Sequence, residues 1–172
     1  MTVGATDVPT ERALLRHFLA ALAYRTAKAL RHAPAGFADF SAGHRIRTPA
    51  EVIRHMTSLV GYARSFFIGG VYHAEPLATF AEEVERFHAM LDALSSELRS
   101  DRPFLGEMSE RRMLQGPLAD AMTHAGQLAI LRRMYGSPVP PENFIFAHIA
   151  EDRLGPDQAE PARPDDEWPE AP

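Results

Sequence analysis

Apolar residues recur at helical spacing in four long stretches of the chain, which are separated by segments without a period. The stretches are residues 9–32, 48–70, 76–99 and 116–135. Apolar positions three to four residues apart lie on one face of an α-helix, so each stretch predicts an amphipathic helix. Four such helices with connections of unequal length predict an all-α fold, an up-down-type four-helix bundle.

The second and fourth stretches carry sequence signals for their ends. Thr48 stands before a proline and three residues before a glutamate, which is typical of a capping box with proline at the first helical position. Gly69 and Gly70 follow this helix. In the fourth stretch Pro117 stands near the start and Gly136 follows the last helical residue, so one helix of about five turns is expected.

The apolar face of each helix is expected to point into a common core. The residues expected there are Leu14, Leu15, Phe18, Leu22 and Ala29 in the first helix, Val52, Leu59 and Phe66 in the second, Leu77, Phe80, Val84, Phe87, Leu91, Leu94 and Leu98 in the third, and Ala121, Leu128, Ile130, Leu131 and Met134 in the fourth. Thr57 is expected to face away from the core. His88 falls at the border of its apolar stripe and is expected at the rim. The histidines expected at the surface are His17, His32 and His148.

Three polar residues interrupt the apolar face of the fourth helix. At roughly 100° per residue, the side chains of Asp120, His124 and Gln127 lie on one side of it. Polar groups that face a core need partners, because the water that they lose is otherwise not replaced. The sequence leaves three partners open: a divalent metal ion, a hydrogen bond between Asp120 and His124, or an ion pair of Asp120 with an arginine on a neighbouring helix.

Further candidate residues lie on the first and second helices. His55 shares the apolar arc of its helix, where a lone histidine is more often a satisfied core residue than a ligand. It becomes of interest as a site residue only beside Asp120 and His124. Tyr62, about two turns later on the same arc, is a candidate hydrogen-bond donor to a substrate. Arg25 stands near the edge of the first helix's apolar arc and could bind an acidic group or form a surface salt bridge.

Length and composition predict one helical domain followed by a tail. With 172 residues and 45% apolar content, residues 1–150 can bury a core, and we expect residues 151–172 to form an acidic, proline-rich tail. The part of the tail from residue 155 onward is expected to be loosely ordered or strapped across the surface. Residues 137–148 are expected to fold back onto the bundle, and the charged connection 101–113 to hold a short helical turn.

Charge and composition exclude several classes of function. Residues 150–172 hold eight acidic residues and two arginines, which leaves the remaining chain nearly neutral and without a basic stripe for nucleic acid. The chain has no cysteine, so any thiol must come from a substrate. No apolar run is long enough to span a membrane, and the first residues lack a secretory signal pattern. We therefore expect a cytoplasmic protein that binds neither nucleic acid nor a membrane.

Several motifs resemble the DinB/YfiT-like superfamily. The fourth helix reads His-x-Gly-Gln at His124–Gln127, with a ligand position four residues before it, and the capped second helix carries His55. The segments 128–139 and 142–144 are similar to one branch of this superfamily. The resemblance implies a four-helix bundle, often a homodimer, that binds nickel, zinc, iron or manganese through three histidines. It also implies thiol-dependent transfer or isomerisation as the activity.

Carried over position by position, the resemblance makes His55 the first metal ligand and His124 the last. The middle ligand is usually histidine, and here it is Asp120. Two histidines and one carboxylate suit iron, manganese or zinc better than a soft metal, although the change is equally consistent with a site that has lost its metal. Gln127 is expected to orient a metal ligand by a hydrogen bond without binding the metal itself.

Two hypotheses for function follow. The first is a metal-dependent transferase or hydrolase that uses an activated thiol or water on a small-molecule substrate. The second is a non-catalytic binding protein in which His55, Asp120 and His124 form a structural polar network. A homodimer fits both, because the fourth helix is also apolar on its far side. The far-side residues are Leu118, Met122, Ala125 and Ala129.

Overall fold

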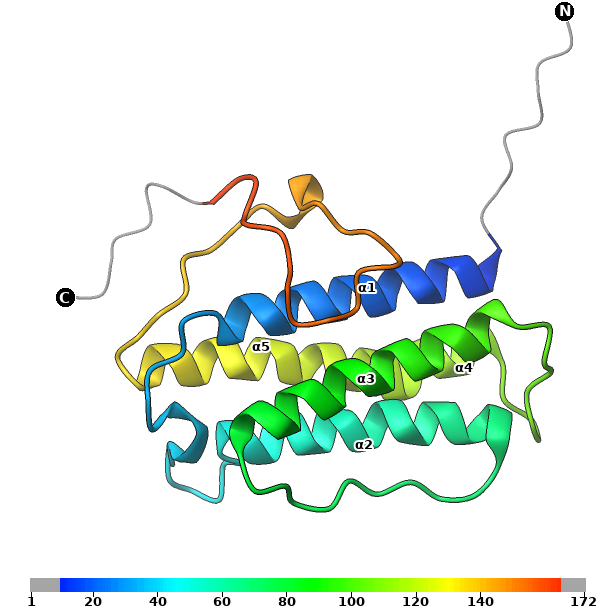
Figure 1. Ribbon diagram of the computed structural model, residues 1–172, viewed down its shortest axis with the longest axis horizontal. Coiled ribbons are helices and arrows are strands. Elements are labelled where there is room, and N and C mark those ends of the chain that lie inside the picture. Colours follow the sequence, from blue (N-terminus) through cyan, green and yellow to red (C-terminus); the bar gives the residue numbers. More distant parts are fainter. Residues whose placement is uncertain (1–9, 165–172) are drawn as a thin grey trace, which may run out of the picture.

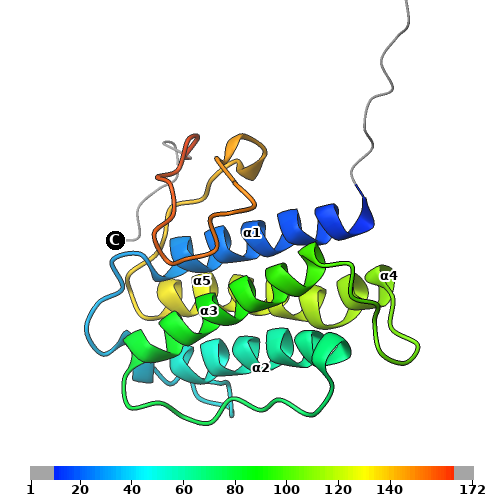
Figure 2. The same ribbon diagram turned by 45° about the vertical axis from the view of Figure 1, so that its right-hand side comes forward.

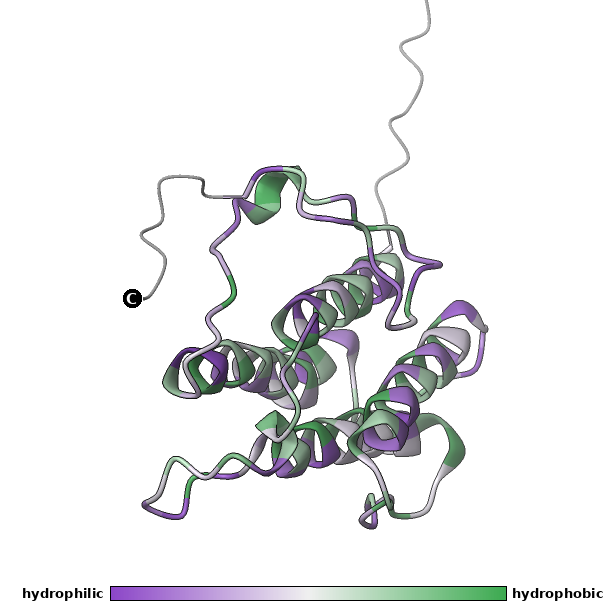
Figure 3. Ribbon diagram, turned by 60° about the vertical axis from the view of Figure 1, so that its left-hand side comes forward, coloured by the Kyte–Doolittle hydropathy of each residue, from purple (hydrophilic) through white to green (hydrophobic). Residues whose placement is uncertain are grey.

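The computed structural model describes residues 10–164 of the chain. Four long helices form its body: α1 (Glu11–Leu30), α2 (Pro49–Ile68), α3 (Phe80–Arg99) and α5 (Ala119–Met134). They lie side by side along one direction (Figures 1 and 2), and each carries hydrophilic and hydrophobic residues around its circumference (Figure 3). The predicted all-α four-helix bundle is confirmed.

The direction of the helices depends on one long connection. Residues 69–79 run back along the bundle from the end of α2 to the start of α3 (Figure 1). Arg54 near the start of α2 therefore pairs with Glu83 near the start of α3, and Arg64 further along α2 pairs with Glu97. As a result α2 and α3 run parallel.

The start of α5 is more complex than the sequence predicts. The connection after α3 holds the expected helical turn, α4 (Glu110–Met113), and this passes directly into a π-helical stretch, η2 (Leu114–Leu118). Gly116 has non-helical backbone angles within this stretch. Proline has no N–H to donate, so Pro117 interrupts the ladder of helical hydrogen bonds at this point. The π-helical stretch sets the position of the first turn of α5.

The core consists mainly of the residues expected from helical spacing, with several exceptions. Leu14 is 58% exposed, and Ile130 and Met134 on α5 are also exposed. Leu77 is exposed and precedes α3, which begins at Phe80. The placements of Leu14, Ile130 and Met134 in the core were wrong, because the neighbouring helices cover a narrower arc than the apolar stripes occupy. The placement of Leu77 was wrong because this residue lies in the connection before α3.

Thr57 was expected to face away from the core, and this was wrong. Its side chain is fully buried, and its hydroxyl donates a hydrogen bond to the carbonyl oxygen of Ile53 at 2.9 Å. A threonine hydroxyl can satisfy itself on its own helix in this way, so burial carries little cost.

Of the four far-side residues, Leu118 at the end of η2 and Ala125 on α5 are buried within this chain's own core, whereas Ala129 is exposed. Residues 10–164 therefore cover that side only in part.

Residues 137–164 form a strap that lies across α1 (Figure 1). Its anchors are the hydroxyl of Tyr24, which donates to Glu142 at 2.7 Å, and Arg31, which pairs with Glu160 at 2.6 Å. The expected return of residues 137–148 onto the bundle is confirmed. The described part of the tail, as far as residue 164, includes Glu160, which pairs with Arg31. The rest of the tail, including Trp168, lies outside the described residues.

His88 is buried under this strap, so its expected place at the rim was wrong. It is 3% exposed, and its Nδ1 lies 2.6 Å from the carbonyl oxygen of Leu154. Because a carbonyl only accepts, Nδ1 carries the proton, and Nε2 is left buried without a partner. Burial lowers the pKa of His88 below its usual value, although the bond to Leu154 acts in the opposite direction.

Arg132 on α5 fastens the ends of α1 and α5 to the strap. Its buried guanidinium donates to the carbonyl oxygens of Ala29 at 3.0 Å and Arg31 at 2.9 Å, and to both oxygens of Ser137 at 2.9 Å. One side chain thus satisfies carbonyl groups that the helix ends would otherwise leave unpaired.

Glu83 is another buried charged group that holds parts of the fold together. Its carboxylate accepts hydrogen bonds from Arg54 at 2.8 Å, from the Leu77 amide at 2.9 Å and from Arg86. Burial alone would raise the pKa of Glu83, but these donors outweigh it and lower the pKa. Glu83 therefore holds the end of the 69–79 connection against α2 and α3.

The three histidines predicted at the surface, His17, His32 and His148, are exposed. Within residues 10–164, no helix combines the length and the apolar character that a membrane crossing requires.

Candidate metal centre

The packing of α2 against α5 brings together His55, Asp120 and His124. One potential ligand atom from each lies within 4.8 Å of the other two, and among the described residues this is the group with metal-ligand spacing. The sequence placed Asp120 and His124 on one face of a helix, and the structure adds His55 from the neighbouring helix.

The first turns of α2 and α5 both lie near the site, and each has a local stabilising feature. The capping box predicted at Thr48 is present: its hydroxyl accepts from the Glu51 amide, and the Glu51 carboxylate accepts from the Thr48 amide. This box sets the start of α2 two turns before His55. Asp120 lies in the first turn of α5, where the positive end of the helix dipole favours a carboxylate.

His124 is the most buried member, with 6% exposure. Its Nδ1 lies 2.7 Å from the side-chain oxygen of Gln127, which can only accept, so Nδ1 is the protonated nitrogen. The other nitrogen, Nε2, faces Oδ1 of Asp120 at 3.4 Å. In neutral histidine both of these atoms are acceptors. The Asp120 side chain is 51% exposed, so it does not face the core as the sequence predicted, and solvent reaches this pair. A positive group, either a proton or a metal ion, would bridge the two acceptors.

His55 meets His124 edge to face, with ring centroids 4.6 Å apart and planes at 87°. Burial lowers the pKa of His55, and the positive charge of Arg47 and the presence of His124 lower it further, while Asp120 acts in the opposite direction. A lowered pKa keeps the imidazole neutral at neutral pH, which is the form that binds metals.

The spacing fits a divalent ion. Two ligand atoms that each lie about 2.1 Å from a tetrahedral ion are about 3.4 Å apart, and this is the distance from His124 Nε2 to Asp120 Oδ1. The remaining distances are no more than 4.8 Å. Even if both distances are at this limit, a move of His55 by about 1.5 Å would complete the set.

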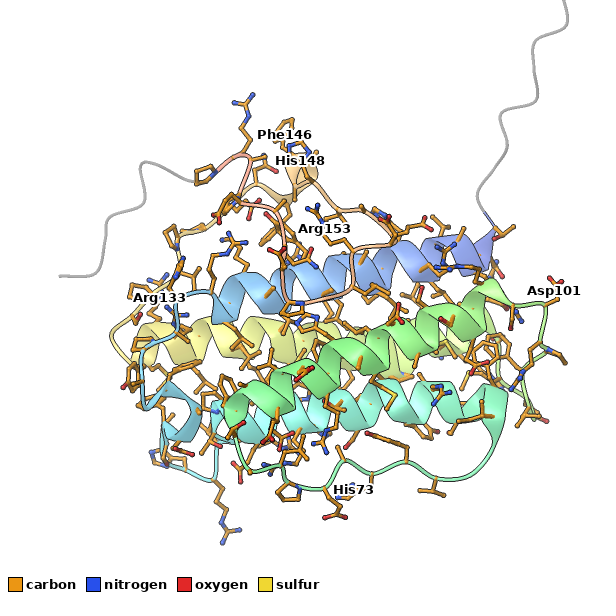
Figure 4. The ribbon with its side chains drawn as sticks, viewed as in Figure 1. His73, Asp101, Arg133, Phe146, His148 and Arg153 are labelled. Carbon is orange, nitrogen blue, oxygen red and sulfur yellow. The ribbon has the colours of Figure 1, made fainter. Side chains whose placement is uncertain are left out.

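An open groove of about 720 Å³ leads to His55 from solvent. Its walls come from α2 and from residues 69–79, where His73 lies on the connection beside α2 (Figure 4). Tyr62 lines the same groove, is 49% exposed and packs edge to face on Phe66. The structure therefore places Tyr62 in the groove that reaches His55, and its role as a donor stays a prediction.

Sequence reasoning missed three residues of this groove: Arg47, Tyr72 and His73. All three lie in segments without periodicity, so no sequence signal placed them near α2. Arg47 also lines a second groove on the other side of the site, together with Gln127. The groove beside His55 also contains Glu51 and Glu75, so the charges along it are mixed.

The remaining sequence candidates do not join the site. His88 lies under the strap, and His148 is exposed on the strap itself (Figure 4). Of the two roles expected for Arg25, a surface salt bridge is not found within residues 10–164, and binding of an acidic group stays a prediction. Its observed contact is with the ring of Phe144, whose centre lies 3.8 Å from the guanidinium carbon.

Comparison with known proteins gives no match: no family model, no curated protein and no solved structure matches the chain. The resemblance to the DinB/YfiT-like superfamily therefore rests on the sequence motifs alone and stays a prediction.

Proposed function

We propose that His55, Asp120 and His124 bind one divalent metal ion, and that the protein is a metal-dependent enzyme acting on a small molecule. The observation that carries this proposal is the acceptor pair of His124 Nε2 and Asp120 Oδ1, 3.4 Å apart, with His55 adjacent. Two acceptors at this spacing are stabilised by a cation between them, and a neutral third donor is available to complete its coordination.

The donor set narrows the choice of ion. Two imidazole nitrogens and one carboxylate oxygen suit iron, manganese or zinc, and also accommodate nickel. Three protein ligands leave one or more positions for solvent or substrate, which distinguishes a catalytic site from a closed structural one. Access to such a position is supported by the groove beside His55 and by the 51% exposure of the Asp120 side chain.

A bound ion of this kind lowers the pKa of a thiol or water in an open position, which supports thiol transfer or hydrolysis as the reaction class. The protein's own residues have separate parts in this scheme. Gln127 holds the His124 proton on Nδ1, so that Nε2 is free to bind. Tyr62 presents a hydroxyl in the groove, which Arg47 lines together with Glu51 and Glu75. The chain has no cysteine, so the thiol is a low-molecular-weight substrate.

The test of this proposal is whether a thiol reaches the ion. The purified protein is loaded with Co²⁺, and 2-mercaptoethanol is added while the absorption spectrum is recorded. We expect a thiolate-to-cobalt band in the near ultraviolet for the wild type and for Asp101→Ala, a control in the connection after α3 (Figure 4), and none for Asp120→Ala. A cobalt spectrum that neither thiol nor azide changes would mean a closed site and would contradict an enzymatic role.

A second candidate is a non-catalytic, dimeric binding protein. It is favoured by the contacts that the three residues already make to one another, since a protonated His124 paired with Asp120 would satisfy the same geometry. In that case a chelator leaves thermal stability unchanged, whereas an ion bound to the folded state raises it.

A further inference from the structure

A second pocket lies on the other side of α5 from the candidate metal centre. It is open to solvent, has a volume of about 300 Å³ and is bordered by α1, α5 and the part of the strap from Val139 to Phe144. None of the three candidate ligands lines it. The proposed metal site therefore gives this pocket no role.

The charges around this pocket have one sign. Arg25, Lys28 and Arg133 line it, and Arg133 stands near the end of α5 (Figure 4). No acidic residue is among the lining residues of the described chain. Lys28 is partly neutralised by Glu142, whose carboxylate lies 3.7 Å from its Nζ. The guanidinium group of Arg25 adds positive charge at the mouth of the pocket, which attracts an anion.

Arg25 is held in a position suited to a carboxylate. Its guanidinium carbon stands 3.8 Å from the centre of the Phe144 ring. This contact uses the face of the guanidinium and leaves the N–H groups along its edge for other partners. Within residues 10–164, no carboxylate lies within ion-pair distance of Arg25. Because stacking already restricts the side chain, a bidentate bond to a carboxylate would cost less conformational entropy.

The rest of the pocket is apolar and has depth because of one glycine. Met122, Ala129 and Ile130 contribute apolar surface from α5. A Cβ added at Gly126 would meet no atom within 4 Å, so the absence of a side chain there leaves room in the pocket. At about 30 Å³ for a water-sized group, the volume accommodates roughly ten such groups.

We propose that this pocket binds an organic carboxylate with an apolar body of roughly ten non-hydrogen atoms. Arg25 forms the bidentate bond to the carboxylate, and the apolar body lies over Gly126 and Ile130. A neutral molecule of the same shape would leave Arg25 without its partner and would bind more weakly.

The experiment is a titration of the full chain with octanoate, followed by amide chemical shifts in ¹H–¹⁵N spectra, with octanamide as the uncharged ligand of the same shape. Three variants accompany it. Arg25→Gln removes the anchor, and Gly126→Leu fills the pocket at a helical position that tolerates a side chain. Arg111→Gln removes an exposed arginine on α4 and is the control.

We expect saturable shifts at the amides of Gly126, Ala129 and Phe144, with octanamide and the Arg25→Gln variant each about tenfold weaker. Gly126→Leu should abolish these shifts while its helical circular dichroism and melting temperature stay at least at the wild-type level. Arg111→Gln should bind as the wild type does. The proposal is overturned if octanoate gives no saturable shifts at these amides, if octanamide binds equally well, or if Gly126→Leu still binds.

Discussion

Replacing Gln127 by alanine should weaken metal binding without unfolding the protein. The side-chain oxygen of Gln127 accepts the Nδ1 proton of His124 at 2.7 Å, and His124 is nearly buried while Gln127 is exposed. In the apo protein His124 can shift its proton to Nε2 and pair with Asp120. In the Gln127→Ala variant a metal ion on Nε2 prevents this shift. The proton must then stay on Nδ1, where the acceptor oxygen of Gln127 is missing.

The size of the effect follows from that unpaired group. A buried donor without a partner costs about 1–3 kcal/mol, which corresponds to a loss of about 5- to 150-fold in metal affinity. Loss of an outer hydrogen bond to a ligating histidine typically costs about 10- to 100-fold, in the same range. Gln127→Glu should bind metal more tightly than the wild type, since a carboxylate is the stronger acceptor.

The assay is competition for Zn²⁺ or Co²⁺ between the protein and a chromophoric chelator. Thr123→Ala is the matched control on α5, because the Thr123 hydroxyl bonds only to the Ala119 carbonyl of its own helix. Equal affinities for the wild type and Gln127→Ala, with Thr123→Ala also unchanged, would refute this account of the site.

Three further predictions concern stability. Burial lowers the pKa of His88, so the unfolded chain binds more protons than the folded protein below about pH 6.5. The free energy of unfolding should therefore fall by up to about 1.4 kcal/mol per pH unit below that pH. Urea titrations at pH 8 and 5.5 should show a smaller loss of stability for His88→Gln than for the wild type. Glu83→Gln should lower the free energy of unfolding by about 3 kcal/mol at pH 7, because two arginines lose their buried partner. The difference in stability between wild type and variant should fade as the pH falls through the lowered pKa of Glu83. An undiminished difference at pH 3 would contradict this. Arg132→Met should lower the free energy of unfolding by at least about 2 kcal/mol by leaving buried carbonyls unpaired, whereas the exposed neighbour Arg133→Met should cost far less in the same denaturation assay.

The expected homodimer is a separate prediction. Sedimentation equilibrium of the wild type should give twice the mass of one chain over a range of protein concentrations. A single-chain mass at all concentrations would exclude it.

The helices were predictable because their signals are local. The capping box at Thr48 and the apolar spacing within each helix depend on residues a few positions apart, and they gave the bundle. The same local logic put Asp120 and His124 on one face of α5. Errors arose where a residue's surroundings come from distant parts of the chain. His88 is buried because Leu154 lies on it, and the strap that carries Leu154 has no periodic pattern.

The candidate site was predictable only in part for the same reason. Nothing in the sequence pattern of α2 says that His55 meets His124, and the resemblance to a family supplied that link. The groove walls at Tyr72 and His73 depend on how residues 69–79 return along the bundle, which the sequence does not signal. Likewise, the π-helical stretch before Asp120 arises from the combined effect of Gly116 and Pro117 on one turn.

The central claim is that His55, Asp120 and His124 hold a metal ion, and elemental mass spectrometry tests it most directly. The protein is purified without a histidine tag, beside His55→Ala, Asp120→Ala and the exposed control His17→Ala. We expect about one divalent ion per chain in the wild type and in His17→Ala, and almost none in the other two variants. A wild type that stays empty after incubation with iron, manganese, zinc and nickel, or variants that retain the ion, would contradict the claim.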